Sequence, residues 1–97
     1  MEENTQNPEA FYAKLKNELE QTTVFPCEYL YKFILPDLAE NREALHAVFL
    51  NSNALITEKP SSGGKYIAYS VRLVLSSADE VIHYYQEAGK IKGIISL

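Results

Sequence analysis

Alternating apolar residues mark two long strands. Over residues 24–35 the odd positions from Tyr29 onward are aromatic or aliphatic, whereas the even positions mix Glu28 and Lys32 with aliphatic residues. Residues 66–75 alternate more strictly, with an apolar side chain at every odd position. A period of two with aromatic and β-branched residues is typical of a strand with one buried face. The sequence therefore predicts strands over 24–35 and 66–75.

Apolar residues at helical spacing predict a first helix over residues 8–21. Asn7 is placed as its N-cap, and Pro8 follows at the first helical position, where proline is favoured. The apolar stripe of this helix is formed by Tyr12, Leu15 and Leu19. Because the stripe is narrow, the helix must dock on another element to be stable.

Two further helices are predicted downstream. The second is capped either by Asp37 with Glu40 or by Asn41 alone, and it ends at an Asn-Ser-Asn run. The third opens at a serine pair with acidic residues at capping-box spacing and ends at Gly89. Both carry an apolar stripe that suits packing against a sheet.

Two short strands, over 54–59 and 91–97, complete the predicted order of strand, helix, strand, strand, helix, strand. Right-handed crossovers place both helices on the same face of one antiparallel sheet. The expected fold class is therefore α+β, a ferredoxin-like βαββαβ two-layer sandwich with a four-stranded sheet and an extra N-terminal helix. We divide the chain into a tail and helix over 1–23 and a ferredoxin-like domain over 24–97.

Composition narrows the classes of function. Among the 97 residues, 13 acidic and nine basic side chains leave a net charge of −4, which disfavours nucleic acid as a partner. The acidic N-terminus does not resemble a signal peptide, and no apolar run reaches the roughly 20 residues of a membrane span. A single cysteine, Cys27, leaves no internal disulfide. We expect a cytoplasmic protein that binds neither nucleic acid nor membrane.

The residue pattern contains no recognisable catalytic or metal-binding site. His46 and His83 lie on different predicted helices, so with one cysteine they form no metal site, and no cofactor is expected. Cys27 lacks an adjacent histidine or helix N-terminus that would lower its pKa. An acylphosphatase would need an arginine-bearing glycine-rich loop after the first strand, where this chain has PDLAEN. We therefore expect a protein that is not an enzyme.

The segment KPSSGGKY is the candidate ligand-binding loop. Successive backbone N–H groups in such a loop can bind an anion, with lysines supplying charge. The interpretation that we favour is a hairpin connection that needs positive φ at Gly63 or Gly64. The candidate ligand-binding residues are Lys59, Ser61, Ser62, Gly63, Gly64 and Lys65.

The open face of the predicted sheet is more apolar than a solvated face requires. Lys32, Arg72 and Lys92 surround its aliphatic residues. Either the N-terminal helix covers this face with Phe11, Leu15 and Leu19, or another subunit does. The candidate interaction residues are Leu30, Ile34, Arg72, Val74 and Ile94.

The stretches FPCEYLYKF, KPSSGGKYIAYSV and YYQEAGKI resemble signature segments of the YbeD-like proteins, a bacterial family of unknown function. The resemblance covers residues 25–97 and is most specific in the Lys-Pro-Ser-Ser segment 59–62, followed by Gly64 and Tyr66. It implies a ferredoxin-like fold similar to ACT regulatory domains, a cytosolic location and no established catalysis. The helix over 8–21 and a short crossover over 36–53 depart from the family's usual form.

Two functions are consistent with these observations. The leading hypothesis is a small non-catalytic regulatory or ligand-binding module similar to ACT domains, able to self-associate and to bind a small metabolite. The alternative is a protein-protein interaction domain that docks on an enzyme through its open sheet face. The identity of the ligand or protein partner does not follow from the sequence.

Overall fold

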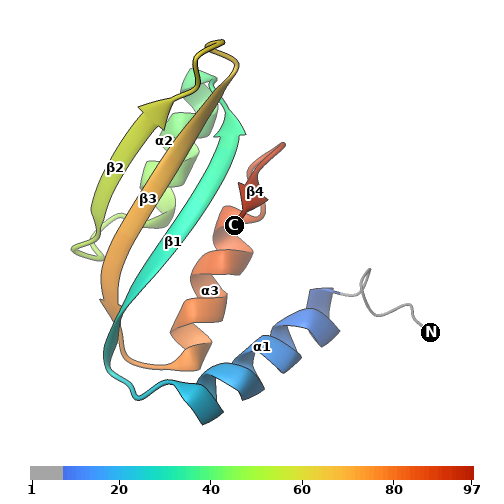
Figure 1. The fold of residues 1–97 in the computed structure, drawn as a ribbon, viewed down its shortest axis with the longest axis vertical. Coiled ribbons are helices and arrows are strands. Elements are labelled where there is room, and N and C mark those ends of the chain that lie inside the picture. The colour runs from blue at the N-terminus through green and yellow to red at the C-terminus, as the bar shows by residue number, and fades with distance from the viewer. Residues whose placement is uncertain (1–7) are drawn as a thin grey trace.

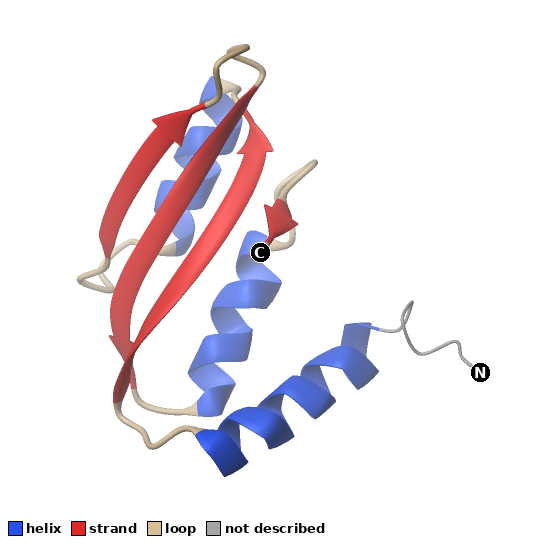
Figure 2. Cartoon of the chain, in the orientation of Figure 1, coloured by secondary structure: helices blue, strands red, loops and turns tan. Residues whose placement is uncertain are grey.

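An antiparallel four-stranded sheet with two helices behind it forms the body of the fold (Figure 1, Figure 2). The computed structural model describes residues 8–97, so the predicted cap at Asn7 lies outside the described residues. In chain order the elements are α1 Pro8–Thr22, β1 Cys27–Pro36, α2 Ala39–Val48, β2 Leu55–Pro60, β3 Tyr66–Leu75, α3 Ala78–Ala88 and β4 Ile95–Ser96. The strand order β2-β3-β1-β4 confirms the predicted ferredoxin-like arrangement.

The pairing of the two central strands decides which residues of the sheet face the helices and which face outward. β1 pairs with β3 without a bulge from Cys27 opposite Leu75 to Pro36 opposite Tyr66. The predicted first strand therefore begins too early, because Val24 precedes it and is 86% exposed. An unbroken register keeps every odd residue of both strands on the helix side of the sheet.

The core lies between the sheet and the helices α2 and α3. Tyr31 and Phe33 of β1 are fully buried and stack with 5.6 Å between ring centroids. Phe49, just after α2, stacks on Tyr84 of α3 at 4.9 Å. The residues predicted to form one contiguous core all belong to it, with Tyr29 and Tyr85 half-buried at its margin: Tyr29, Tyr31, Phe33, Leu45, Phe49, Ile67, Tyr69, Val71, Leu73, Val81 and Tyr85.

The start of α2 differs from both predicted caps. Leu38 occupies the N-cap position, and no side chain caps the helix. Asp37 instead accepts a hydrogen bond from Arg42, while buried Asn41 donates its Nδ2 to the Pro36 carbonyl over 3.1 Å. Side chains thus connect the first turn of α2 to the end of β1, but none of them accepts a hydrogen bond from the free N–H groups at the start of the helix.

The start of α3 matches the prediction. The Ser77 hydroxyl accepts a hydrogen bond from the Glu80 N–H over 3.2 Å. The Glu80 carboxylate in turn accepts from the Ser76 N–H. This reciprocal arrangement is a variant of the capping box, and it fixes the first turn of the helix beside the end of β3.

The last strand is much shorter than the predicted 91–97. Ile91 is buried in the core directly after α3, and Gly93 adopts φ +80°. A Cβ at Gly93 would lie 2.8 Å from Pro36 Cγ, so only glycine permits this turn. β4 consequently pairs with Phe33 and Ile34 alone.

The N-terminal helix α1 leaves the open face of the sheet uncovered. It packs against α3, with Leu19 buried in the core and Lys16 Nζ 3.0 Å from Asp79 Oδ1. The Asp79 hydrogen bond raises the pKa of Lys16. Phe11, expected to cover the open face, is 58% exposed, and α1 extends to one side of the sheet (Figure 1). Intramolecular cover of the open face by α1 is therefore the wrong alternative.

Replacing Phe33 with alanine tests the core. Phe33 is fully buried among aromatic rings, so Phe33→Ala should lower the free energy of unfolding by about 3–5 kcal/mol through lost burial and a residual cavity. Leu30→Ala is the control, because Leu30 lies on the same strand but on its outward face and is 44% exposed. Guanidinium denaturation measures both changes, and equal midpoints for the two variants would contradict the strand phase.

Candidate functional site

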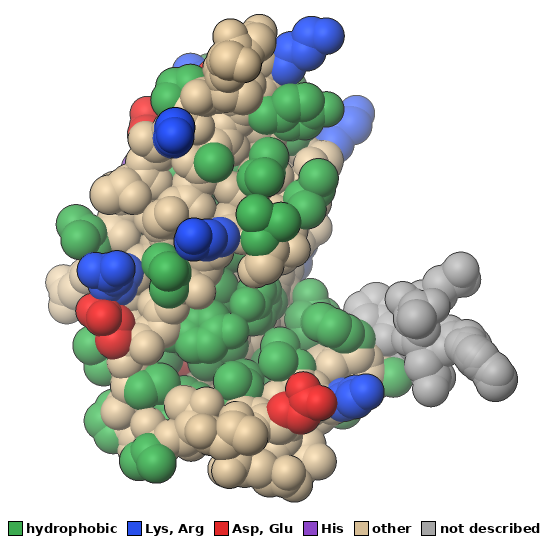
Figure 3. Space-filling view, in the orientation of Figure 1, with side chains coloured by type: hydrophobic (Ala, Val, Ile, Leu, Met, Phe, Trp, Pro, Cys, Tyr) green, Lys and Arg blue, Asp and Glu red, His purple; other side chains and the backbone are tan. Residues whose placement is uncertain are grey.

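The open face of the sheet has no other helix or strand of residues 8–97 packed across it. It consists of the outward residues of the four strands, which the strand register aligns in rows: Glu28, Leu30, Lys32 and Ile34 of β1, Leu55, Thr57 and Lys59 of β2, Tyr66, Ala68, Ser70, Arg72 and Val74 of β3, and Ile95 of β4. Figure 3 views this face and shows apolar side chains interspersed with basic ones.

Large apolar side chains on the open face are exposed. Val74, Leu55 and Ile95 keep 67%, 62% and 52% of their surface in solvent. The predicted interaction residues Leu30 and Val74 lie here as expected, and Ile34 is partly covered beside Ile95. Apolar side chains gathered on one sheet face favour an interaction surface over a solvated one.

Ile94 does not belong to the open face. It packs against the core, whereas Ile95 lies opposite Ile34 and faces outward. The turn at Gly93 shifts the strand by one residue relative to the prediction. Because side chains alternate along a strand, a shift of one residue exchanges the two faces.

The open face carries three cations and one carboxylate. Arg72 Nε lies 3.8 Å from Glu28 Oε1, and both side chains are more than half exposed. Lys32 and Lys59 form no ion pair with another described residue. The face is therefore basic although the chain carries a net charge of −4.

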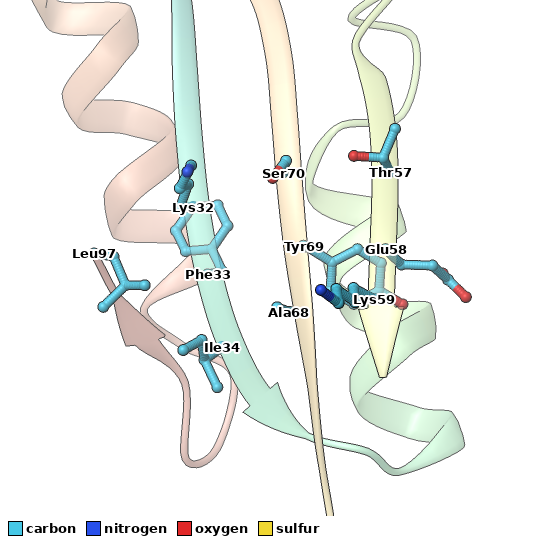
Figure 4. Close-up of a pocket in the computed structure, with 10 residues that line it drawn as sticks. All are labelled: Lys32, Phe33, Ile34, Thr57, Glu58, Lys59, Ala68, Tyr69, Ser70 and Leu97. Carbon is cyan, nitrogen blue, oxygen red and sulfur yellow. The ribbon is translucent and has the colours of Figure 1, made fainter. Parts of the chain in front are cut away.

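A shallow groove of about 400 Å³ crosses the open face between the two unpaired lysines (Figure 4). Its outward lining comprises Lys32, Ile34, Thr57, Lys59, Ala68, Ser70 and Leu97. Two cations beside aliphatic and hydroxyl groups are suited to an anionic group with an apolar neighbour. Leu97 and Thr57 were not among the predicted site residues, because their place in the groove depends on strands that join only in the fold.

The KPSSGGKY loop forms the β2–β3 hairpin. The Ser61 N–H donates to the Tyr66 carbonyl over 2.9 Å, and the Ser61 hydroxyl accepts from the Tyr66 N–H over 3.2 Å. Gly64 N–H donates to the Ser61 carbonyl over 3.0 Å. Gly64 supplies the positive φ that the hairpin needs, at +74°, whereas the φ of Gly63 is not positive.

The structure separates the predicted ligand-binding residues into two groups. Lys59 points to the groove of the open face, whereas Ser61, Ser62, Gly63, Gly64 and Lys65 lie in the exposed hairpin beyond it. Ser61 is engaged in holding the turn. Ligand binding by the hairpin itself stays a prediction.

The hydroxyl groups of three tyrosines, Tyr31, Tyr69 and Tyr85, lie inside the fold, where a deprotonated hydroxyl would be poorly solvated. Burial raises the pKa of Tyr31 and of Tyr85. The Tyr31 hydroxyl donates to the Val81 carbonyl over 2.8 Å, and the Tyr29 and Tyr85 hydroxyls lie 3.0 Å apart. Burial, with the Glu58 carboxylate acting in the same direction, raises the pKa of Tyr69 to about 12. The Tyr69 hydroxyl is buried near the Glu58 carboxylate but forms no hydrogen bond of standard geometry with a described residue.

Metal-binding groups do not cluster in the part of the chain that the structure describes. No three histidine, cysteine or acidic side chains within residues 8–97 lie close enough to hold an ion. Cys27 is half-buried at the start of β1. No described helix is both long and apolar enough to span a bilayer.

Removing single hydroxyl groups tests the tyrosine assignments. Tyr69→Phe should raise the free energy of unfolding by about 1 kcal/mol, since it removes an unsatisfied buried group, whereas Tyr31→Phe should lower it by about 1 kcal/mol. Because the folded-state pKa of Tyr69 is raised from 10.0 to about 12, the wild-type protein should lose stability as the pH rises through that window. Tyr69→Phe should lose less, as measured by thermal unfolding from pH 8 to 12.

The hairpin glycines give a matched pair of variants. Gly64→Ala should destabilise the protein by about 1–2 kcal/mol, because an alanine side chain is strained at φ +74°. Gly63→Ala should be nearly neutral, since its φ is not positive and no atom lies within 4 Å of the added Cβ. Chemical denaturation of both variants measures the difference, and equal losses would contradict the turn geometry.

Comparison with solved structures supports the fold. The chain is similar to the solution structure of protein HP0495 from H. pylori, with a TM-score of 0.61 and 20% sequence identity. The match covers 78% of this chain and 86% of that one. At this identity the likeness establishes the fold and leaves the function open.

Sequence comparison gives the family. A UPF0250 protein from Haemophilus ducreyi is 31% identical over 85 residues, which cover 84% of each chain. The model of a family described as a protein of unknown function (DUF493) matches residues 20–97, from the last turn of α1 to the end of the chain. The resemblance to YbeD-like proteins is thereby confirmed, and this chain belongs to the DUF493 family of proteins of unknown function.

Proposed function

We propose that this protein is a non-catalytic regulatory module that binds a partner protein through the open face of its sheet. The observation that carries the proposal is the packing of α1 on α3, which leaves exposed aliphatic residues such as Val74 and Leu55 without cover. Apolar patches of this kind, bordered by charged residues, are typical of protein docking surfaces.

Charge indicates what the partner surface carries. Lys32, Lys59 and Arg72 outnumber the single carboxylate, Glu28, among the outward strand residues. Two copies that met face to face would set these cations against each other, at a cost in association free energy. An acidic surface with an apolar centre complements the open face, and the opposite charges would also speed encounter.

A non-catalytic role agrees with the groups that line the groove. Thr57 and Ser70 supply its hydroxyls, and neither forms a hydrogen bond to a side-chain base among the described residues. A hydroxyl needs such a base to become a nucleophile. The groove therefore offers contacts for binding without an activated group.

A small anionic metabolite is the second candidate for this face, as in an ACT-like module. The groove of about 400 Å³ with Lys32 and Lys59 at its sides favours it. A shallow site open to solvent buries less of a small molecule than an enclosed pocket does. The protein partner therefore ranks first, because it would also bury Val74 and Leu55, which lie outside the groove.

A double substitution on the open face tests the proposal. Leu55→Ser with Val74→Ser should abolish capture of a stoichiometric partner from a lysate of the source cells, whereas the control Val24→Ser with Leu50→Ser should retain it. All four side chains are more than 60% exposed, so neither pair should change folding stability by more than about 1 kcal/mol. Affinity capture with quantitative mass spectrometry measures the difference.

Two results would contradict docking through this face. One is equal capture of the same partner by both double variants. The other is no capture together with a metabolite that raises the melting temperature, which would establish the small-molecule alternative.

A further inference from the structure

The short strand β4 leaves half of one edge of β1 without a partner strand. β4 pairs only with Phe33 and Ile34, and the Leu97 N–H donates to the Lys32 carbonyl over 2.9 Å. Within residues 8–97 no strand lies beside 27–31 on this side. In Figure 1 the lower half of β1 is accordingly bordered by β3 on one side only. A central strand of the sheet thus becomes an edge strand over five residues.

Backbone groups of known direction point from this free edge. In a strand the N–H and C=O groups of alternate residues point to the same side. The Lys32 carbonyl bonds toward β4, so the backbone groups of Leu30 and Glu28 point the same way. The β3 ladder uses the intervening residues, Tyr29 and Tyr31. Glu28 and Leu30 therefore offer two donors and two acceptors to an added strand.

The surroundings of the free edge are apolar. Tyr29 and Tyr85 lie half-buried on its core side, with their rings edge to face and their centroids 6.2 Å apart. Figure 3 shows a hollow floored with apolar side chains between the sheet and α1. A strand added at this edge would bury aromatic surface in addition to forming backbone hydrogen bonds.

The opposite edge of the sheet is protected in a way that this edge is not. β2 carries Glu58 and Lys59 and ends at Pro60, and charged residues and proline on an edge strand disfavour further pairing. Over 27–31 the free edge holds a single charged residue, Glu28, and no proline. The two edges thus differ in their capacity to accept another strand.

We propose that an extended segment of a partner protein adds to β1 at this edge, antiparallel to it and in line with β4. The segment would place apolar side chains opposite Tyr29 and Tyr31, on the core side, and a basic side chain opposite Glu28. This edge adjoins the open face, since Glu28 lies opposite Val74, but it binds through backbone groups of β1 and not through the side chains of Val74 and Leu55. It is therefore a second mode of binding, and its test does not depend on the proposed function.

A second copy of this chain fits the edge less well than a foreign strand. Leu97 occupies the position opposite Lys32, so a symmetric antiparallel pair can use only residues 27–31. Centred on Tyr29, such a pair sets Glu28 of each copy opposite Leu30 of the other. Centred on Glu28, it sets two carboxylates against each other. Centred on Leu30, it would require Glu28 to lie opposite Lys32, where Leu97 already lies. Each of the first two arrangements leaves a carboxylate without its favourable cross-strand partner.

Tethering a strand to the chain tests whether the edge accepts one. Five residues, Val-Thr-Val-Lys-Thr, are appended after Leu97, so that the first four can lie opposite 31, 30, 29 and 28. Hydrogen exchange at the Leu30 and Glu28 amides, followed by NMR, should slow at least about tenfold relative to the unextended chain. The control is Val-Pro-Val-Lys-Thr, in which proline removes the N–H that faces the Leu30 carbonyl, and it should give little protection.

The same two segments supplied as free peptides test binding between molecules. The first should shift the Leu30 and Glu28 amide resonances in a saturable manner, and the proline peptide should not. Unchanged exchange in the tethered chain would overturn the proposal. Protection of these amides in the unextended chain that rises with its own concentration would also overturn it, because a second copy would then be the occupant.

Discussion

The unbroken antiparallel ladder between β1 and β3 is the constraint on which the other features depend. It runs from Cys27 opposite Leu75 to Pro36 opposite Tyr66 without a bulge. Because side chains alternate strictly along such a ladder, one register sends Tyr31, Phe33 and their neighbours inward and their alternates outward. The same register creates both the aromatic core and the open face, so a change in one would necessarily change the other.

The contacts at the ends of this ladder decide what the sheet leaves exposed. At one end, the burial of Leu19 holds α1 against α3 and away from the open face, and an exposed ion pair between Lys16 and Asp79 lies beside this contact. At the other end, the close approach of Gly93 to Pro36 turns the chain so that β4 pairs with two residues only. The first contact leaves an apolar and basic face uncovered, and the second leaves a strand edge with free backbone groups.

Because this chain belongs to a family of unknown function, its uncovered sheet face and free strand edge are the features from which a function can be inferred. A solved structure with 20% sequence identity shares the fold, since an alternating pattern and a filled core tolerate many sequences. Binding, in contrast, depends on particular side chains and backbone groups at the surface. The groups of this chain that a partner would contact are the side chains of Lys32 and Lys59 on the open face and the backbone groups of Leu30 and Glu28 at the free edge.

Local sequence patterns determined most of the fold, and the tertiary structure decided the site. The alternation over 66–75 and the serine cap of α3 could be predicted because each depends on neighbouring residues. The place of Ile94, the length of β4 and the docking of α1 could not, because they depend on contacts between residues distant in the chain, such as Gly93 with Pro36 and Lys16 with Asp79. A periodic pattern specifies which side of an element is apolar, but the free energy of packing between distant elements decides which of those sides is covered.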